Sequence, residues 1–154
     1  EYEGAGQQAA MAFRENLKEE TVLLDVAAAA DALRDIAGKV AISGFCTGGT
    51  WAWISSEALD FDAAVIFYGS DVYDHIGRRP RCPTIMHYGD ADYVVPIDQV
   101  EAIRDAHPEC EFHVYPGAGH AFYNPAQAHY DEAAARLAHD RSVAFLDRTF
   151  AGKS

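Results

Sequence analysis

The fold of this chain is decided by three consecutive segments: VAIS at 40–43, GFCTGG at 44–49 and TWAWI at 50–54. A short apolar run, a turn flanked by glycines and a helix-like stretch, in that order, are typical of a nucleophile elbow. There the chain bends so tightly that the central residue is strained and its neighbours must be small. Such a bend exposes Cys46 at the C-terminal end of a strand. The positive end of the following helix dipole then favours its thiolate.

The same residues have a second interpretation. Gly48 and Gly49 could simply let a helix pack closely on a sheet, with Cys46 a small buried hydrophobic residue. Short glycine motifs recur by chance, so the choice depends on what lies downstream.

Length and composition restrict the class of protein. A chain of 154 residues predicts a single domain spanning 1–154, and 49% hydrophobic with 23% charged residues is ordinary for a globular protein. The net charge of −12 argues against nucleic acids and anionic membrane surfaces as partners, because phosphate binding requires clustered Lys and Arg.

The cysteines and the first residue bear on the cellular location of the protein and on the extent of its domain. Cys46, Cys82 and Cys110 are odd in number and irregularly spaced, which favours reduced thiols in a cytoplasmic protein over a disulfide framework. No apolar run approaches the roughly 18 residues of a membrane span, and no signal peptide is visible. The first residue is Glu1, so we expect that an N-terminal part of the domain is absent from this sequence.

Apolar periodicity predicts alternating strands and helices. We expect helices at 5–18, 22–36, 48–59, 96–106 and 126–150, and strands at 39–45, 63–69, 84–89 and 111–115. This alternation indicates an α/β fold, a three-layer α/β/α sandwich around a parallel sheet.

Turn signals follow the strands, and in open α/β sheets ligands bind outside the carboxyl ends of the strands. An aspartate, Asp92, lies in the loop after the third strand, and His120 follows the fourth. With Cys46 they give the order nucleophile, acid, histidine of the α/β-hydrolases. Asp90 competes with Asp92, but it lies next to Gly89, where a turn-forming aspartate is expected.

Six other histidines compete with His120. Only His120 combines flanking glycines, a loop after a strand and the right place in the chain order. His87 and His113 fall within strands, His129 and His139 on the predicted last helix, and His107 before a proline. His75 lies near Asp71 and Asp74, yet no paired zinc-type spacing appears, so we expect no metal and no cofactor.

Taken together, these motifs resemble the dienelactone hydrolase family of α/β-hydrolases. The resemblance covers about 25–150 and rests on GFCTGG at 44–49, YG at 68–69, CPT at 82–84 leading to GDADYVVP at 89–96, and GHAF at 119–122. The four motifs occur in family order, and a cysteine stands where most related hydrolases carry serine.

The resemblance implies a hydrolase that cleaves small esters or lactones. Cys46 would be the nucleophile, His120 the proton carrier and Asp92 its orienting acid. Thr47 would supply an oxyanion-hole N–H. Tyr68 matches a family tyrosine near the substrate, although an aromatic packed at the strand end fits equally well. Phe122 and Tyr123 are further substrate-binding candidates, with core packing as their alternative.

The chain also departs from the family pattern. The resemblance implies the C-terminal portion of an α/β-hydrolase fold without its early strands, and therefore without the second oxyanion donor and an upstream acidic residue. Its first strand would then be an open edge unless a second copy or another partner covered it. Where dienelactone-specific members carry an arginine after the histidine, Asn124 stands here; Arg78, Arg79 and Arg81 are replacement candidates.

Two other functions therefore stay open. The chain could be a non-catalytic or truncated subunit that needs a partner chain or a missing N-terminal segment. Alternatively, Cys46 could be a redox or amidotransferase-type thiol, since amidotransferase-like folds also carry a cysteine elbow.

Overall fold

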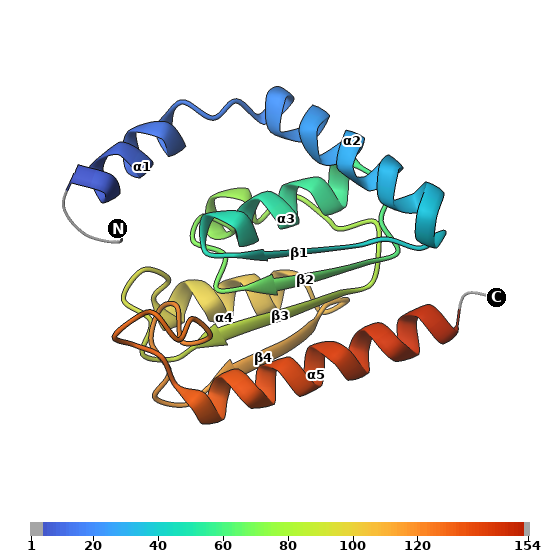
Figure 1. Ribbon diagram of the computed structural model, residues 1–154. Coiled ribbons are helices and arrows are strands. Elements are labelled where there is room, and N and C mark those ends of the chain that lie inside the picture. The colour runs from blue at the N-terminus through green and yellow to red at the C-terminus, as the bar shows by residue number, and fades with distance from the viewer. Residues whose placement is uncertain (1–4, 153–154) are drawn as a thin grey trace.

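A parallel four-stranded sheet forms the centre of the protein. The computed structural model describes residues 5–152 (Figure 1). The strands are β1 (Ala41–Phe45), β2 (Ala63–Phe67), β3 (Thr84–Gly89) and β4 (Glu111–Tyr115), and they pair in the order β1-β2-β3-β4. Every residue of β2 and β3 is buried, as expected for apolar central strands covered on both faces.

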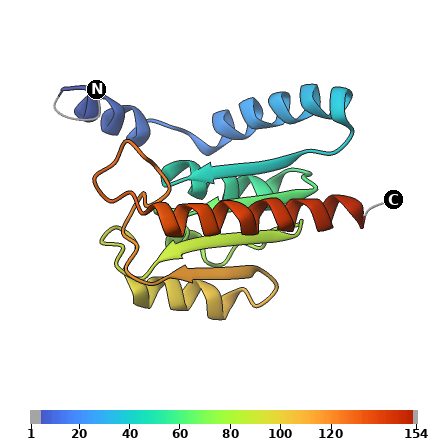
Figure 2. The same cartoon turned by 60° about the horizontal axis from the view of Figure 1, so that its bottom comes forward.

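Helices cover both faces of this sheet, which confirms the predicted three-layer arrangement. The last helix, α5, crosses one face, and α3 and α4 lie on the other (Figures 1 and 2). The longer N-terminal helix, α2, packs beside α3. The helices are α1 (Ala5–Glu15), α2 (Glu19–Ala37), α3 (Thr47–Ala58), α4 (Ile97–Ala106) and α5 (Glu132–Ala151), with a short 3-10 helix, η1 (Tyr73–His75).

Stacked rings mark the strand register on the α5 face of the sheet. Phe45, Phe67, His87 and His113 occupy matching positions on the four strands. Their ring centroids are 4.7, 4.7 and 5.6 Å apart, in that order. Such cross-strand pairs stabilise one register over a slipped one. This ladder ends at the carboxyl edge of the sheet, where Cys46 follows Phe45.

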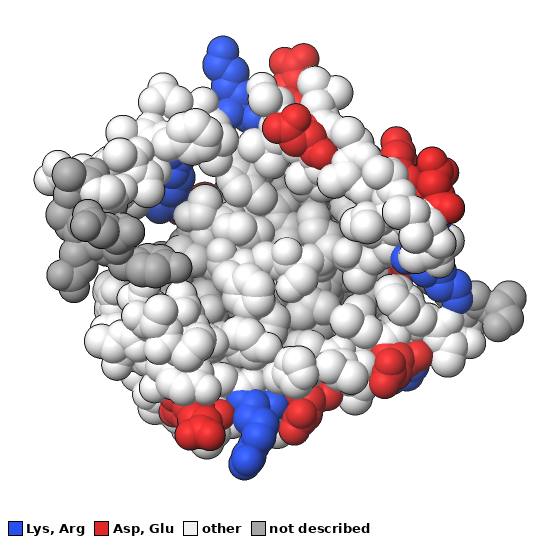
Figure 3. All heavy atoms as spheres, viewed as in Figure 1, with Lys and Arg blue, Asp and Glu red and all other residues white. Residues whose placement is uncertain are grey.

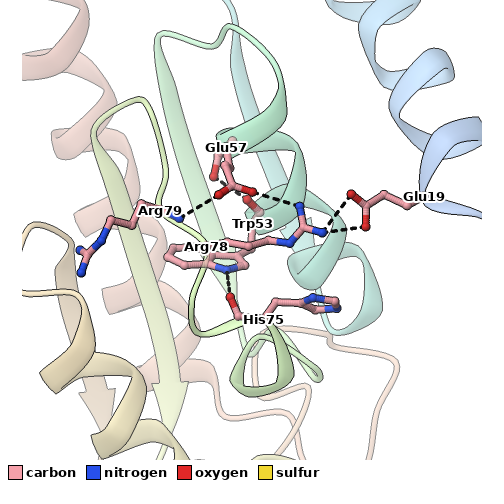
Figure 4. Close-up of polar contacts among 7 residues, drawn as sticks. Glu19, Trp53, Glu57, His75, Arg78 and Arg79 are labelled. Carbon is pink, nitrogen blue, oxygen red and sulfur yellow. Dashed lines mark hydrogen bonds and ion pairs between the residues drawn. The ribbon is translucent and has the colours of Figure 1, made fainter.

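Ion pairs join the N-terminal helices to the rest of the fold. Arg78 donates to both carboxylate oxygens of Glu19 on α2, at 2.9 and 2.8 Å, and to Glu57 on α3 at 3.0 Å (Figure 4). Arg79 pairs with Glu109 at 3.0 Å. On α1, Arg14 pairs with Asp71 at 2.5 Å, in the loop after β2. The arginines after η1 therefore connect segments that are distant in the sequence through ion pairs.

The largest departure from a predicted helix boundary is at the start of the last helix. We expected the last helix to begin at residue 126, but α5 begins at Glu132. Asp131 caps it, because its side chain accepts the N–H of Ala134 at 3.0 Å. Asn124 Oδ1 accepts the N–H of Ala126 at 3.0 Å and holds a turn instead. His129 consequently lies in a loop and not on a helix.

The outer edge of β1 is unpaired among residues 5–152. β1 pairs with β2 alone, and α2 runs above it (Figure 1). An apolar hollow of about 340 Å³ lies between α2 and β1, lined by side chains that include Val26, Leu33 and Trp51. Within the same residues, no helix combines the length and the apolar character that a membrane crossing requires.

The buried His87 predicts a pH dependence of stability. Its Nδ1 contacts Tyr115 Oη at 2.8 Å and its Nε2 contacts Ser142 Oγ at 2.9 Å. Burial, followed by the charges of His113 and Arg141, lowers the pKa of His87 to about 3. The unfolded chain, with an ordinary histidine pKa of about 6.5, gains a proton first on acidification. The contribution of His87 to stability is therefore complete above about pH 6.5 and is lost as the pH falls toward 3.

We expect His87→Gln to remove this contribution, and with it part of the dependence of the unfolding free energy on pH. Between pH 6 and pH 4, the unfolding free energy of the wild type should fall more steeply than that of the variant, by up to about 1.4 kcal/mol per pH unit. Urea unfolding at several pH values measures the difference. Parallel pH profiles for the two proteins would contradict it.

Candidate active site

The bend after β1 has the backbone of a strained elbow. Cys46 has φ 54° and ψ −122°, a conformation unfavourable for a residue with a side chain. A Cβ on Gly44 would lie 1.9 Å from the carbonyl oxygen of Gly48, and one on Gly49 would lie 2.9 Å from that of Phe67. Those two glycines are needed for the close approach of strand and helix. Gly48 is different, since a Cβ there meets nothing within 4 Å.

His120 connects the elbow to the loop after β3. Its Nε2 lies 3.0 Å from Cys46 Sγ, and its Nδ1 lies 2.8 Å from Asp92 Oδ2. The other carboxylate oxygen, Asp92 Oδ1, accepts the N–H groups of Val94 and Val95 at 2.7 and 3.0 Å. The three side chains predicted from the sequence therefore meet in one hydrogen-bonded chain.

The competing aspartate, Asp90, has the expected turn role. Its Oδ1 accepts the N–H of Gly117 at 2.6 Å, joining the loop after β3 to the loop after β4. No contact of Asp90 with His120 is present, whereas Asp92 is 5% exposed and faces the imidazole.

The electrostatic interactions among these three side chains favour a thiolate–imidazolium pair of Cys46 and His120. Burial opposes ionisation of Cys46, but the hydrogen bond and charge of His120, with the N–H and hydroxyl of Thr47, outweigh it and lower the pKa of the thiol. Burial likewise opposes protonation of His120, but hydrogen bonds with Asp92 and Cys46 raise its pKa to about 9. Cys110 lacks such partners, and burial raises its pKa to about 12.

Tyr68 follows β2 and lies against the imidazole. Its side chain is 2% exposed, and its ring centroid is 5.1 Å from that of His120. Burial, and then the charges of Cys46, Tyr123 and Asp92, raise the pKa of Tyr68 above its ordinary value. The phenol therefore stays protonated. Tyr68 both packs in the core and contributes to the wall of a pocket, so each of its two expected roles has a counterpart.

A hollow of about 410 Å³ opens over Cys46 and His120. We call it the Cys46 hollow; it is lined by Phe45, Cys46, Tyr68, Tyr93, His120, Ala121, Asn124, Gln127 and His129. Three of these, Cys46, Tyr68 and Ala121, are the non-glycine residues with positive φ in the described chain. Strained backbone concentrated at one pocket is typical of a functional site.

A second hollow of about 310 Å³ adjoins the first. This Tyr123 hollow is lined by Phe45, Tyr68, Tyr123, Asn124 and Pro125. Tyr123, predicted as a substrate contact, therefore lies beside the Cys46 hollow. Phe122 does not, because its side chain is fully buried between Tyr68 and Tyr115, with ring centroids at 5.4 and 5.1 Å. The core alternative describes the position of Phe122 in this structure, where it lines neither hollow.

Sequence reasoning missed much of the wall of the Cys46 hollow. Tyr93, with its ring centroid 6.2 Å from that of His120, follows directly after Asp92 and is 71% exposed. Gln127 and His129 belong to the loop that was predicted as helix. Arg78, Arg79 and Arg81, considered as substrate-binding cations, line neither hollow. Within residues 5–152, no cluster of three His, Cys, Asp or Glu side chains forms a metal site.

A parallel sheet, a strained cysteine elbow and a histidine–aspartate pair at the carboxyl edge define an α/β-hydrolase fold. The chain belongs to the dienelactone hydrolase family, whose model matches residues 2–150. It is 32% identical over 114 residues to a carboxymethylenebutenolidase of Pseudomonas putida, a match that covers 71% of this chain and 48% of the relative. The chain thus spans about half the length of the curated relatives that it matches.

Solved structures agree on the fold. A crystal structure from Klebsiella pneumoniae, provisionally described as a dienelactone hydrolase, matches with a TM-score of 0.75 and 28% identity, covering 85% of this chain and 62% of that one. Esterase 2 of Thermogutta terrifontis, phosphorylated by paraoxon, matches with a TM-score of 0.69 and 23% identity over 85% of this chain and 64% of that one.

The two glycines beside the elbow predict opposite stability effects. Gly44→Ala forces a methyl group into the Gly48 carbonyl and should cost about 3 kcal/mol of unfolding free energy. Gly48→Ala, in helix α3 with open space around it, should raise stability by up to about 1 kcal/mol. Urea unfolding of both variants makes the comparison. Equal effects would contradict the close-approach argument.

The pKa directions predict selective alkylation of Cys46. Its reaction with iodoacetamide should reach its plateau at a lower pH than an ordinary thiol of pKa about 8.5, while Cys110 should still be unreactive. His120→Ala removes the interactions that oppose the burial effect, so the reaction should move to higher pH. Peptide mass mapping of alkylated protein across pH measures both profiles. Preferential labelling of Cys110 would contradict this assignment.

Proposed function

We propose that this protein hydrolyses small esters or lactones with Cys46 as its nucleophile. The observation that carries the proposal is the hydrogen-bonded chain from Cys46 through His120 to Asp92. Membership of the dienelactone hydrolase family supports it, as does the name of the curated relatives, which specifies a lactone substrate.

In the proposed reaction, the Cys46 thiolate attacks the carbonyl carbon of the substrate. The negative charge moves to the carbonyl oxygen, which accepts the N–H of Thr47 at the start of α3. The C–O bond to the leaving group then breaks, and the His120 imidazolium gives its proton to the departing oxygen. A thioester remains. Neutral His120 next takes a proton from water, which attacks the thioester and releases the acid and the thiolate.

Asp92 acts on the imidazole throughout this reaction. Its carboxylate fixes the Nδ1 proton on the side away from the sulfur and favours the imidazolium. The neutral phenol of Tyr68 lies beside the same ring and can donate a hydrogen bond to substrate.

Cys46→Ala and His120→Ala should each reduce ester hydrolysis by at least about a thousandfold, because each removes a group that acts in both halves of the reaction. Asp92→Asn should lose about as much, since an amide no longer favours the imidazolium. p-Nitrophenyl acetate hydrolysis measures kcat and KM.

The matched controls come from the same loops and the same residue types. Asp90→Asn and Cys110→Ala should keep activity within a few-fold, because neither residue contacts the imidazole. Unchanged hydrolysis by Cys46→Ala would show that the nucleophile is another group.

We also propose a reducing, cytoplasmic location and a partner at the free edge of β1. The first is supported by a reactive Cys46 that forms no disulfide. The second is supported by the unpaired strand and by exposed apolar side chains on α2, where Leu33 is 53% and Ile36 is 84% exposed. Sedimentation velocity tests whether a second copy covers this edge.

A further inference from the structure

The walls of the Cys46 hollow contain no full charge other than that of the reacting groups. Besides Cys46 and Ala121, its residues have aromatic, amide or imidazole side chains. Among the residues that the structure describes, no lysine, arginine, aspartate or glutamate lines either this hollow or the Tyr123 hollow. Among these residues, a bound substrate therefore meets no cation other than the His120 imidazolium.

Three arginines on or near the N-terminal helices are already paired, whereas Arg136 lines a separate hollow together with Tyr123 and Glu132. Arg78 is shared by Glu19 and Glu57, and Arg79 is bound to Glu109. Arg14 is paired with Asp71. None of these three arginines lines the Cys46 hollow or the Tyr123 hollow, and moving one there would leave a glutamate or aspartate without its partner.

The reacting groups themselves disfavour an anion. The Cys46 thiolate and the His120 imidazolium cancel, and Asp92, buried behind the imidazole, leaves the site with one negative charge. The whole chain adds a net charge of −12. In Figure 3, the part of the visible surface near the loop before α5 is largely white, with both acidic and basic side chains along its lower margin. A carboxylate entering this site loses water and gains no cation.

Asn124 lies where the two hollows meet, since it lines both. Its Oδ1 is occupied by the N–H of Ala126 at 3.0 Å. Its NH₂ group is an uncharged donor that suits an ester or ether oxygen of a substrate. Beyond it, Tyr123, Phe45 and Pro125 give the Tyr123 hollow an apolar wall.

From these observations we propose that the pocket selects uncharged esters or lactones and rejects those that carry a carboxylate. The scissile carbonyl lies over Cys46, and an apolar part of the substrate occupies the Tyr123 hollow. This inference rests on the proposed hydrolase function and names its substrate class.

An isosteric pair of esters tests it. 4-Acetoxybenzamide and 4-acetoxybenzoate share the acetyl group and the ring and differ in an amide against a carboxylate. After normalisation to the hydroxide-catalysed rates, we expect kcat/KM to be at least about tenfold higher for the amide. Equal values, or a preference for the carboxylate, would overturn the inference while leaving the hydrolase function intact.

Two variants test whether the pocket itself causes the preference for the uncharged ester. Asn124→Arg adds a cation at the junction of the hollows and should shift the ratio toward the carboxylate by about tenfold. Ala144→Arg adds the same charge at an exposed position on α5 and should leave the ratio within about twofold, because solvent screens it. Equal shifts in both variants would mean that net charge, and not the pocket, selects the substrate.

Alkylation keeps the inference testable without turnover. If neither ester is hydrolysed, the proposed function fails, and the rates of Cys46 alkylation by iodoacetamide and iodoacetate then decide. We expect iodoacetamide to react faster, by more than its advantage with a free small thiol. Iodoacetate reacting as fast or faster would overturn the inference. Thermal unfolding by circular dichroism shows whether each variant is folded.

Discussion

The site depends on one imidazole that is held from both sides. His120 uses one ring nitrogen for Asp92 and the other for Cys46, at 2.8 and 3.0 Å. Cys46, Asp92 and His120 follow three different strands, so these contacts exist only while the strands keep their parallel register. A shift of one residue would turn every side chain of a strand to the opposite face. The stacked ladder from Phe45 to His113 opposes such a shift.

The buried carboxylate of Asp92 is tolerable because its charge is fully hydrogen-bonded. Two backbone N–H groups and the imidazole approach its oxygens. A buried charge without such partners would cost far more than the interaction with His120 returns. The loop 89–96 thus fixes the carboxylate first, and the carboxylate then fixes the tautomer and the orientation of the imidazole.

The sequence predicted what depends on local pattern and chain order. Strands β3 and β4 match their predicted bounds, because apolar runs between turn signals define buried strands. The elbow, the acid and the histidine were found because the carboxyl ends of parallel strands converge. Asp92 could be preferred to Asp90 because a residue further out in the loop reaches further.

What depends on loop conformation could not be predicted. Residues 126–131 are rich in helix formers, yet the caps at Asn124 and Asp131 leave them as a loop, and this loop supplies Gln127 and His129 to the pocket. Phe122 lies in a loop, where no helix or strand periodicity in the sequence indicates whether a side chain faces the core or the pocket. The requirement for a small residue at Gly48 was wrong, since only the approach of the Gly44 and Gly49 backbones is close.

Backbone strain is concentrated around the pocket. Cys46, Tyr68 and Ala121 each adopt a left-handed φ that glycine would adopt more cheaply, at about 1–2 kcal/mol per residue. For Cys46 and Tyr68, glycine would remove the side chain that faces the hollow. Ala121 has no reactive group, so the role of its strained conformation is to position the neighbouring residues. It turns the chain directly after His120, and its carbonyl accepts the N–H of Asn124 at 2.9 Å. The packing of the sheet core thus offsets the strain of a rim that positions both the imidazole of His120 and the neutral amide of Asn124 along the pocket.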